Sequence, residues 1–235
     1  MTTAMESLLD GTPAGAADDQ RIDWDYLAWC DGLVGGASAE VRDVLEAIED
    51  RWALDGGISR AAVVEVADGD PVRLLISSMV WGFGTIPYGP ARTSKMLAAP
   101  QLRESLADIA AAARTSAEIA FSSLFHSGRP RVPGLSIAMG SKFLYFGAGG
   151  LDATPGSPLV YDLNVYRSLK NLDGGWAEAP NPRKGMSSAL YAAYVRFVDD
   201  LANTRQRSRD DVEIALFAGS TWLRRRRRLD AIASR

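Results

Sequence analysis

Apolar residues recur at helical spacing along most of the chain. The pattern predicts helices over 24–33, 38–52, 70–83, 91–99, 100–125, 187–206 and 209–228, the fifth of which can be two helices. Ser38 and Asp70 are suited to cap two of them, and Pro71 suits a first helical position. Gly/Pro-rich loops are expected at 82–90 and 126–134. Alternating apolar and polar runs are scarce, so the predicted class is mainly α.

The segment GLSIAMGSKFLYFGAG, residues 134–149, is typical of a helix, a tight turn and a second helix. Gly140 would supply the turn, Ser141 would cap the second helix, and Lys142 would lie in its first turn. The positive end of a helix disfavours an ammonium there and favours the neutral, nucleophilic amine. The alternative is that Lys142 is a solvated residue at a helix end.

The segment PLVYDLNVYRSL, residues 158–169, places Asp162 directly after an apolar run and before a predicted helix. The side chain is expected to cap that helix, and backbone N–H groups would then hold the carboxylate ionised. Capping alone would also explain this aspartate.

Together these two segments resemble the helix-hairpin-helix DNA glycosylases that cut an abasic site with a lysine. The separation of 20 residues between Lys142 and Asp162 is close to the usual separation in that superfamily. Within it, residues 70–223 look most like the 8-oxoguanine DNA glycosylases, including the archaeal type. The resemblance implies a two-lobed helical fold with a hairpin at 130–149 and a cleft between the lobes. In place of the usual Gly-hydrophobic-Gly, the hairpin has Ala138-Met139-Gly140.

The resemblance also implies residues for the base and the chemistry. The last helix, VEIALFAGSTWL, resembles the family helix in which a polar residue reads the base and an aromatic one stacks on it, here Glu213 and Phe217. Phe146 would wall the other face, with core packing as the alternative for both phenylalanines, and Trp81 could be pocket wall or core. Lys142 would attack the sugar, and Asp162 would stabilise the charge that develops there.

DNA contacts are expected at the hairpin and at one loop. Gly140 and Ser141 would offer backbone N–H groups to a phosphate, and Arg129 and Arg131 lie just upstream. In the loop WGFGTIPYGPART, residues 81–93, the resemblance makes Tyr88 the wedge and Arg92 the reader of the partner base. Arg224–Arg228 is at most an accessory basic patch.

Composition narrows the remaining choices. Residues 1–70 hold 16 Asp and Glu against 4 Lys and Arg, whereas residues 71–235 hold 13 against 22, and a basic part of this size suits a polyanion. A single cysteine, Cys30, excludes an internal disulfide and a four-cysteine metal site. No apolar run is long enough to cross a membrane, and residues 1–20 are expected to be a disordered tail rather than a signal peptide.

The sequence therefore predicts a monomeric, cytoplasmic, nucleoid-associated DNA glycosylase and abasic-site lyase, with residues 21–235 forming one helical domain. Its substrate would be 8-oxoguanine or a related modified purine in DNA, which the enzyme would remove in base excision repair. Two alternatives stay open: a glycosylase for another modified base, for example in defence against phage DNA, and a non-catalytic DNA-binding protein. No metal or cofactor is needed for the chemistry; relatives suggest a structural monovalent cation in the hairpin.

Overall fold

The computed structural model describes residues 3–33 and 38–233, with side chains as far as residue 221, so the predicted patch at Arg224–Arg228 lies outside the described side chains. The α-helices are α1 (Ala4–Asp10), α2 (Tyr26–Gly32), α3 (Ala39–Asp55), α4 (Arg60–Ala67), α5 (Pro71–Phe83), α6 (Gly89–Leu97), α7 (Leu102–Ala113), α8 (Ala117–Ser123), α9 (Ile137–Gly147), α10 (Leu163–Asn171), α11 (Ser188–Arg205) and α12 (Arg209–Ala233). A short 3-10 helix, η1 (Gly150–Asp152), and the strands β1 (Phe125–His126) and β2 (Arg129–Pro130) complete the elements.

The mainly α class is confirmed, and helix capping explains many of the boundaries. Ser38 caps α3 through its side chain, and Asp70 caps α5 with Pro71 at the first helical position. These side chains accept hydrogen bonds from backbone N–H groups that have no partner within the helix. The segment predicted at 100–125 is two helices, α7 and α8, because the chain turns at Arg114–Ser116, where Ser116 caps the second.

The N-terminal segment is folded, so the predicted disordered tail over residues 1–20 is wrong for the described part, which begins at Thr3. Thr3 and Glu6 form a capping box at the start of α1, and Met5 and Leu9 are buried. Helix α1 packs against α12, at the opposite end of the sequence. Two buried apolar side chains and a reciprocal cap stabilise even a seven-residue helix when a partner helix is present.

Helix α4 was not among the predicted helices. Its sequence RAAVVEVA is nearly continuous in apolar residues, and short apolar runs of this kind do not distinguish helix from strand. Ser59 caps it, and Asp68 ends it in the left-handed conformation, with φ 45°. The helix matters because its first residue, Arg60, reaches the functional site.

The predicted tight turn at Gly140 is wrong. Helix α9 is continuous from Ile137 to Gly147 and is capped by Ser136, so Gly140 lies inside it. A Cβ at Gly140 would stand 2.8 Å from Leu124 Cδ1, which indicates that this glycine permits close helix packing instead of a turn. The chain turns earlier, through Gly134 with φ 88°, in the connection between α8 and α9.

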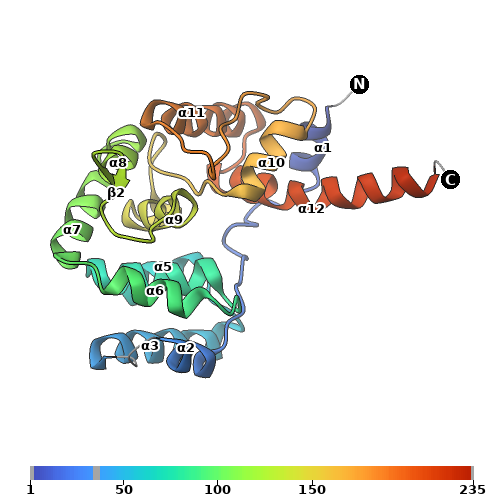
Figure 1. The fold of residues 1–235 in the computed structure, drawn as a ribbon. Coiled ribbons are helices and arrows are strands. Elements are labelled where there is room, and N and C mark those ends of the chain that lie inside the picture. Colours follow the sequence, from blue (N-terminus) through green and yellow to red (C-terminus); the bar gives the residue numbers. More distant parts are fainter. Residues whose placement is uncertain (1–2, 34–37, 234–235) are drawn as a thin grey trace.

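The helices lie in tiers (Figure 1). Helices α1, α10, α11 and α12 are at the top of that view, α2 and α3 are at the bottom, and α5, α6 and α9 lie between them. One continuous hydrophobic core contains residues from the N-terminal Met5 to Leu216 in α12. No helix in the described ranges is long and apolar enough to cross a membrane. The two-lobed division and the single-domain boundary stay predictions.

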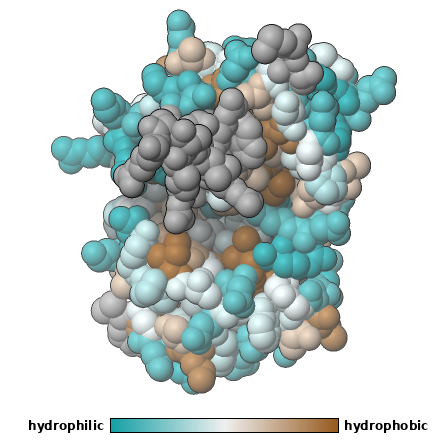
Figure 2. All heavy atoms as spheres, turned by 90° about the vertical axis from the view of Figure 1, so that its right-hand side faces the viewer, coloured by the Kyte–Doolittle hydropathy of each residue, from teal (hydrophilic) through white to brown (hydrophobic). Residues whose placement is uncertain are grey.

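The face on the right of Figure 1 is not flat. In the space-filling view of that face, the surface is hollowed between the upper and lower parts, and hydrophobic residues lie beside the recess (Figure 2). The segment that joins α1 to α2 crosses between the tiers on the same side (Figure 1).

Candidate active site

A groove of about 620 Å³ runs between α5–α6 on one side and α9–α10 on the other. We call it the outer groove. Residues from six separate segments line it: Gly82, Phe83, Ile86, Tyr88, Arg92, Ser136, Ala138, Met139, Lys142, Asp162, Leu163, Asn164, Pro182 and Arg183. The N-terminal ends of α9 and α10 both face it. The start of α9 carries N–H donors and partial positive charge, and Arg92 and Arg183 add two cations, so the outer groove is suited to anionic groups.

A smaller cavity of about 230 Å³ adjoins the outer groove, and we call it the inner pocket. Its lining is Gln20, Ile22, Arg60, Trp81, Gly82, Ile86, Lys142, Val160, Asp162, Asn164, Glu213 and Phe217. Lys142 and Asp162 line both cavities, so they lie at the junction between them.

Lys142 and Asp162 face each other at this junction. The Nζ of Lys142 is 3.5 Å from the Oδ2 of Asp162, and the two side chains are only 8% and 14% exposed. The same nitrogen is 3.5 Å from the carbonyl oxygen of Ala138, one turn earlier in α9. The sequence paired these two residues from spacing and resemblance, and the fold brings their charged groups together.

Lys142 reaches the junction for a different local reason than the one predicted. It lies in the second turn of α9, beyond the first turn to which a helix-terminal field is largely confined, so the helix-terminus argument for a neutral amine does not hold. Its stem packs on Gly82 of α5: a Cβ at that position would be 2.9 Å from Lys142 Cδ. The missing side chain at Gly82 therefore leaves room for the lysine.

Asp162 caps α10, as the sequence predicts. Its Oδ1 accepts hydrogen bonds from the backbone N–H groups of Asn164 at 2.8 Å and Val165 at 3.1 Å, which leaves Oδ2 directed at Lys142. The segment before it is fixed by Ser141, whose hydroxyl accepts from the N–H of Tyr161 at 3.0 Å. One buried serine thus connects α9 to the residue next to Asp162.

The inner pocket has two aromatic side chains, Trp81 and Phe217, both among the predicted base-binding residues. Trp81 is buried, and its Nε1 has no hydrogen-bond partner among the described residues. Phe217 is 38% exposed, which is unusual for phenylalanine on the inward side of a helix and fits a pocket wall. The predicted wall at Phe146 is wrong: this ring lines neither cavity, because it is buried behind Trp81, with ring centroids 5.2 Å apart.

Glu213 is in the inner pocket, but it is not isolated there. Its Oε2 accepts a hydrogen bond of 2.5 Å from Nη2 of Arg60. Arg60 also donates from Nε to Gln20 Oε1 at 2.9 Å, and its guanidinium lies over the rings of Trp81 and Tyr145 at 5.2 and 5.0 Å. Burial raises the pKa of the Glu213 carboxyl, and the neighbouring Arg60 partly offsets the increase.

The predicted phosphate contacts at Gly140 and Ser141 are wrong. Both residues are buried inside the packed helix α9, so their N–H groups cannot meet a ligand. At the start of α9, the cap Ser136 and the first-turn residues Ala138 and Met139 line the outer groove, and Lys142 lines it in the next turn. The helix N-terminus expected at Ser141 is therefore found five residues nearer the start of the chain, at Ser136.

The four predicted DNA-contact side chains fall into two groups. Tyr88 and Arg92 line the outer groove, where the Arg92 guanidinium lies 5.1 Å from the Tyr88 ring. Arg129 and Arg131 line neither cavity; Arg131 instead pairs with Asp108, Nη2 to Oδ2 2.8 Å. The short hairpin β1–β2 carries this arginine pair away from the junction.

Several lining residues were not predicted from the sequence, among them Gln20, Arg60, Asn164 and Arg183. Gln20 lay in the predicted tail, and Arg60 lay in the missed helix α4. A signal for Asn164 was available, because the second residue after a capping aspartate lies in the same turn as the carboxylate. Nothing in the local sequence around Arg183 distinguishes it from other loop arginines.

The described residues contain no cluster of three or more His, Cys, Asp and Glu side chains placed to hold a metal ion. The monovalent cation that the resemblance implies at the hairpin stays a prediction, and no step below depends on it.

Comparison with known proteins identifies the family. Residues 15–217 match the family described as "Putative 8-oxoguanine DNA glycosylase OGG-like protein", a span that includes every residue at the junction of the two cavities. Comparison with the curated proteins and with the solved structures gave no match. Because the match covers most of the chain, this protein belongs to that OGG-like family.

Proposed function

We propose that the protein is a DNA glycosylase with abasic-site lyase activity that excises 8-oxoguanine or a related modified purine through a lysine Schiff base. One observation carries the proposal: the buried Lys142 amine faces the Asp162 carboxylate at 3.5 Å, where a groove meets a pocket. Family membership supports the DNA substrate, and the geometry supports the lysine chemistry.

The two cavities fit two parts of one extruded nucleotide. The outer groove would hold the sugar-phosphate backbone, with the N-terminus of α9 and the side chains of Arg92 and Arg183 meeting phosphates. The inner pocket would take the base after it leaves the stack, between Trp81 and Phe217. Stacking of this kind contributes about 1–3 kcal/mol per base. C1′ of the sugar would then lie at the junction, beside Lys142.

The reaction follows from that placement. The Lys142 amine, once deprotonated, forms a bond from Nζ to C1′ as the bond between C1′ and the base nitrogen breaks, and the base departs with the electron pair. The Asp162 carboxylate stabilises the positive charge that develops on the sugar ring. Ring opening protonates O4′ and leaves an imine between Nζ and C1′. Loss of a C2′ proton then breaks the C3′–O3′ bond by β-elimination and cuts the strand.

The burial of one lysine among four supports Lys142 as the nucleophile. The chain has four lysines, at positions 95, 142, 170 and 184. Lys95, Lys170 and Lys184 are exposed, and only Lys142 is buried. A protein that only binds DNA has no use for a buried amine against a carboxylate, because phosphate contacts come from exposed cations. The pair therefore favours the enzyme over the binding protein.

Trapping with borohydride tests the proposal. Duplexes that each carry one modified base, including 8-oxoguanine, are incubated with the protein and then reduced, which converts an imine into a stable covalent bond. A protein–DNA adduct together with a cut strand is expected. An adduct with a different modified base would identify another glycosylase substrate, whereas binding without any adduct or released base across the set would contradict the enzyme.

Gly82→Ala is expected to lower base release by roughly tenfold or more. The added methyl would stand 2.9 Å from Lys142 Cδ and 2.6 Å from Met139 Cε, so both side chains must shift, and the Lys142 amine is expected to move relative to Asp162. Because alanine is favoured over glycine in a helix by about 1 kcal/mol, part of the steric cost in stability is offset. Single-turnover rates and thermal unfolding measure the two effects separately.

Gly147→Ala is the matched control for this substitution. It also adds a methyl to a helical glycine, but the nearest atoms would be 3.5 Å or more away. Base release should stay at the wild-type rate. If Gly82→Ala also keeps that rate while folding normally, the packing of Lys142 on α5 does not position the amine.

A further inference from the structure

A buried group of charged side chains lies behind the inner pocket and joins three helices. Arg60, the first residue of α4, is 1% exposed. Its Nη2 donates to Glu213, and its Nη1 is 3.5 Å from Asp210 Oδ1 without a hydrogen bond to any described residue. The Asp210 Oδ1 accepts a hydrogen bond of 2.6 Å from the Tyr145 hydroxyl. One guanidinium thus faces two buried carboxylates.

The position of Arg60 is fixed from several sides. Its Nε–H can only donate, so the Gln20 atom that accepts it at 2.9 Å is the amide oxygen. The rings of Trp81 and Tyr145 lie on the guanidinium at 5.2 and 5.0 Å. A planar group held in this way presents its donors in fixed directions, which a lysine ammonium cannot do. The oxygen of Glu213 that faces Arg60 is therefore also fixed.

The charges around Glu213 oppose one another. Burial raises its pKa, Arg60 lowers it, and Asp162 and Asp210 raise it further. Tyr191 and Tyr194 of α11 also interact with this carboxylate, but burial raises the pKa values of both phenols, so they stay neutral at physiological pH. Lys142, on the far side of Asp162, completes the charged groups that line the pocket. Among them, Arg60 is the cation in direct contact with Glu213.

We propose that Arg60 is a positioning residue that holds Glu213 as an ionised hydrogen-bond acceptor in the inner pocket, so that the site selects bases with N–H donors on the edge they present. This inference rests on the proposed glycosylase function and adds the means of base selection. With Oε2 engaged by Arg60, the Glu213 Oε1 is the oxygen left for a base.

The protonation of Glu213 decides which base fits. An ionised carboxylate only accepts hydrogen bonds, whereas a protonated one can donate. A guanine-type base presents two adjacent N–H donors, at N1 and at its exocyclic N2, whereas an adenine-type base presents one exocyclic donor at N6 beside an acceptor at N1. Arg60 therefore favours 8-oxoguanine over 8-oxoadenine, although both have the same oxidised five-membered ring.

The test compares single-turnover release of 8-oxoguanine and 8-oxoadenine from otherwise identical duplexes across pH. The ratio of the two rates is the readout, because any effect of pH on the chemical step that both substrates share cancels in it. For the wild-type protein we expect a ratio above tenfold at neutral pH, falling as the pH is lowered through the raised pKa of Glu213. The fall should occur at a higher pH than an ordinary glutamate would give.

Two substitutions separate the proposal from a structural role. In Arg60→Lys the positive charge remains, but the planar set of N–H donors of the guanidinium is lost, so the fall in the ratio should move to higher pH. In Glu213→Gln, Arg60 keeps the amide oxygen and turns the NH2 group into the pocket, so the ratio should drop at least tenfold and no longer depend on pH. Arg51→Lys is the matched control, because Arg51 pairs with Glu65 of α4 at an exposed position, and its profile should equal the wild-type profile.

The possible outcomes separate the role of Arg60 from the glycosylase function on which it rests. Release of a base with a ratio that neither pH nor Glu213→Gln changes would overturn the role of Arg60 and leave the glycosylase intact. No release of any base by the wild-type protein would overturn both. If Arg60→Lys does not fold, the wild-type and Glu213→Gln profiles still decide the matter, because the predicted pH dependence must be present in the first and absent from the second.

Discussion

Lys142→Gln is expected to abolish the borohydride-trapped adduct and to lower strand cutting by roughly 10³-fold or more, because glutamine has no amine to attack C1′. Glutamine is similar in length to the lysine stem, and the surrounding packing on Gly82 is kept. The positive charge that it removes is buried against Asp162 and is not an exposed phosphate contact. Affinity for duplex DNA should therefore change little. Gel separation of the covalent adduct and a binding titration measure the two properties on the same samples.

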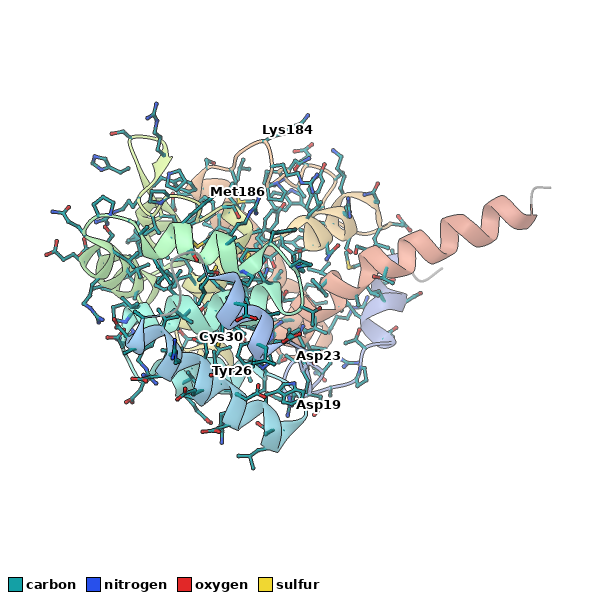
Figure 3. All side chains as sticks on the ribbon, turned by 60° about the horizontal axis from the view of Figure 1, so that its bottom comes forward. Asp19, Asp23, Tyr26, Cys30, Lys184 and Met186 are labelled. Carbon is teal, nitrogen blue, oxygen red and sulfur yellow. The ribbon has the colours of Figure 1, made fainter. Side chains whose placement is uncertain are left out.

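Lys184→Gln is the control for this experiment. Lys184 is exposed and follows Arg183, which lines the outer groove, so its amine is near the site without being part of the junction (Figure 3). The adduct should form in this variant as in the wild-type protein, with at most a modest loss of affinity that salt suppresses. An adduct that persists in Lys142→Gln and disappears in Lys184→Gln would mean that Lys184, in the exposed loop, forms the imine in place of Lys142.

The pairing of Lys142 with Asp162 could be predicted because local rules fix each partner. A capping aspartate has one oxygen occupied by backbone N–H groups and a second oxygen free, and the apolar stretch before it must be buried. The run of bulky residues after Lys142 likewise predicts a buried helix. Local rules do not predict that these two helices meet in space and bring the two groups together. That long-range contact was expected only from the resemblance.

The hairpin was misplaced because one residue type serves two purposes. Gly140 is equally suited to a tight turn and to close packing between helices, and only the tertiary contact with Leu124 shows which applies. The actual turn has its own signals, Gly134 with positive φ and Ser136 as the cap. Each candidate turn is followed by a serine that could cap a helix, and only the burial of Ser141 inside α9 leaves Ser136 as the cap.

The contacts of Arg60 could not be read from local sequence. Its hydrogen-bond and ion-pair partners lie 40, 150 and 153 positions away along the chain, at Gln20, Asp210 and Glu213. The segment that carries Gln20, residues 1–20, was predicted to be a disordered tail. In the fold, this segment is held by hydrogen bonds from Gly15 and Ala17 to Asp211, and by the bridge between Ile22 and Ile58. Figure 3 shows Asp19 and Asp23 on the same segment.

Asp162→Asn is expected to lower base release by about 10²–10³-fold, with little change in stability. Asparagine caps a helix as well as aspartate does, so the bonds to Asn164 and Val165 are kept and α10 stays in place. What is lost is the negative charge that stabilises the developing positive charge on the sugar, and preorganised electrostatic contacts of this kind have effects of that size. Single-turnover release of the base measures the loss of rate, and thermal unfolding measures whether the stability provided by the helix cap is kept.

Asp70→Asn provides a close match for this substitution. Asp70 caps α5 through hydrogen bonds from the N–H groups of Val72 and Arg73, and its other oxygen pairs with Arg103, so it also combines a cap with an ion pair. It lines neither the outer groove nor the inner pocket. If both variants lost base release equally, the effect would come from weakened capping or from net charge. A loss confined to Asp162→Asn would place the required negative charge at the junction of the two cavities, 3.5 Å from the only buried lysine.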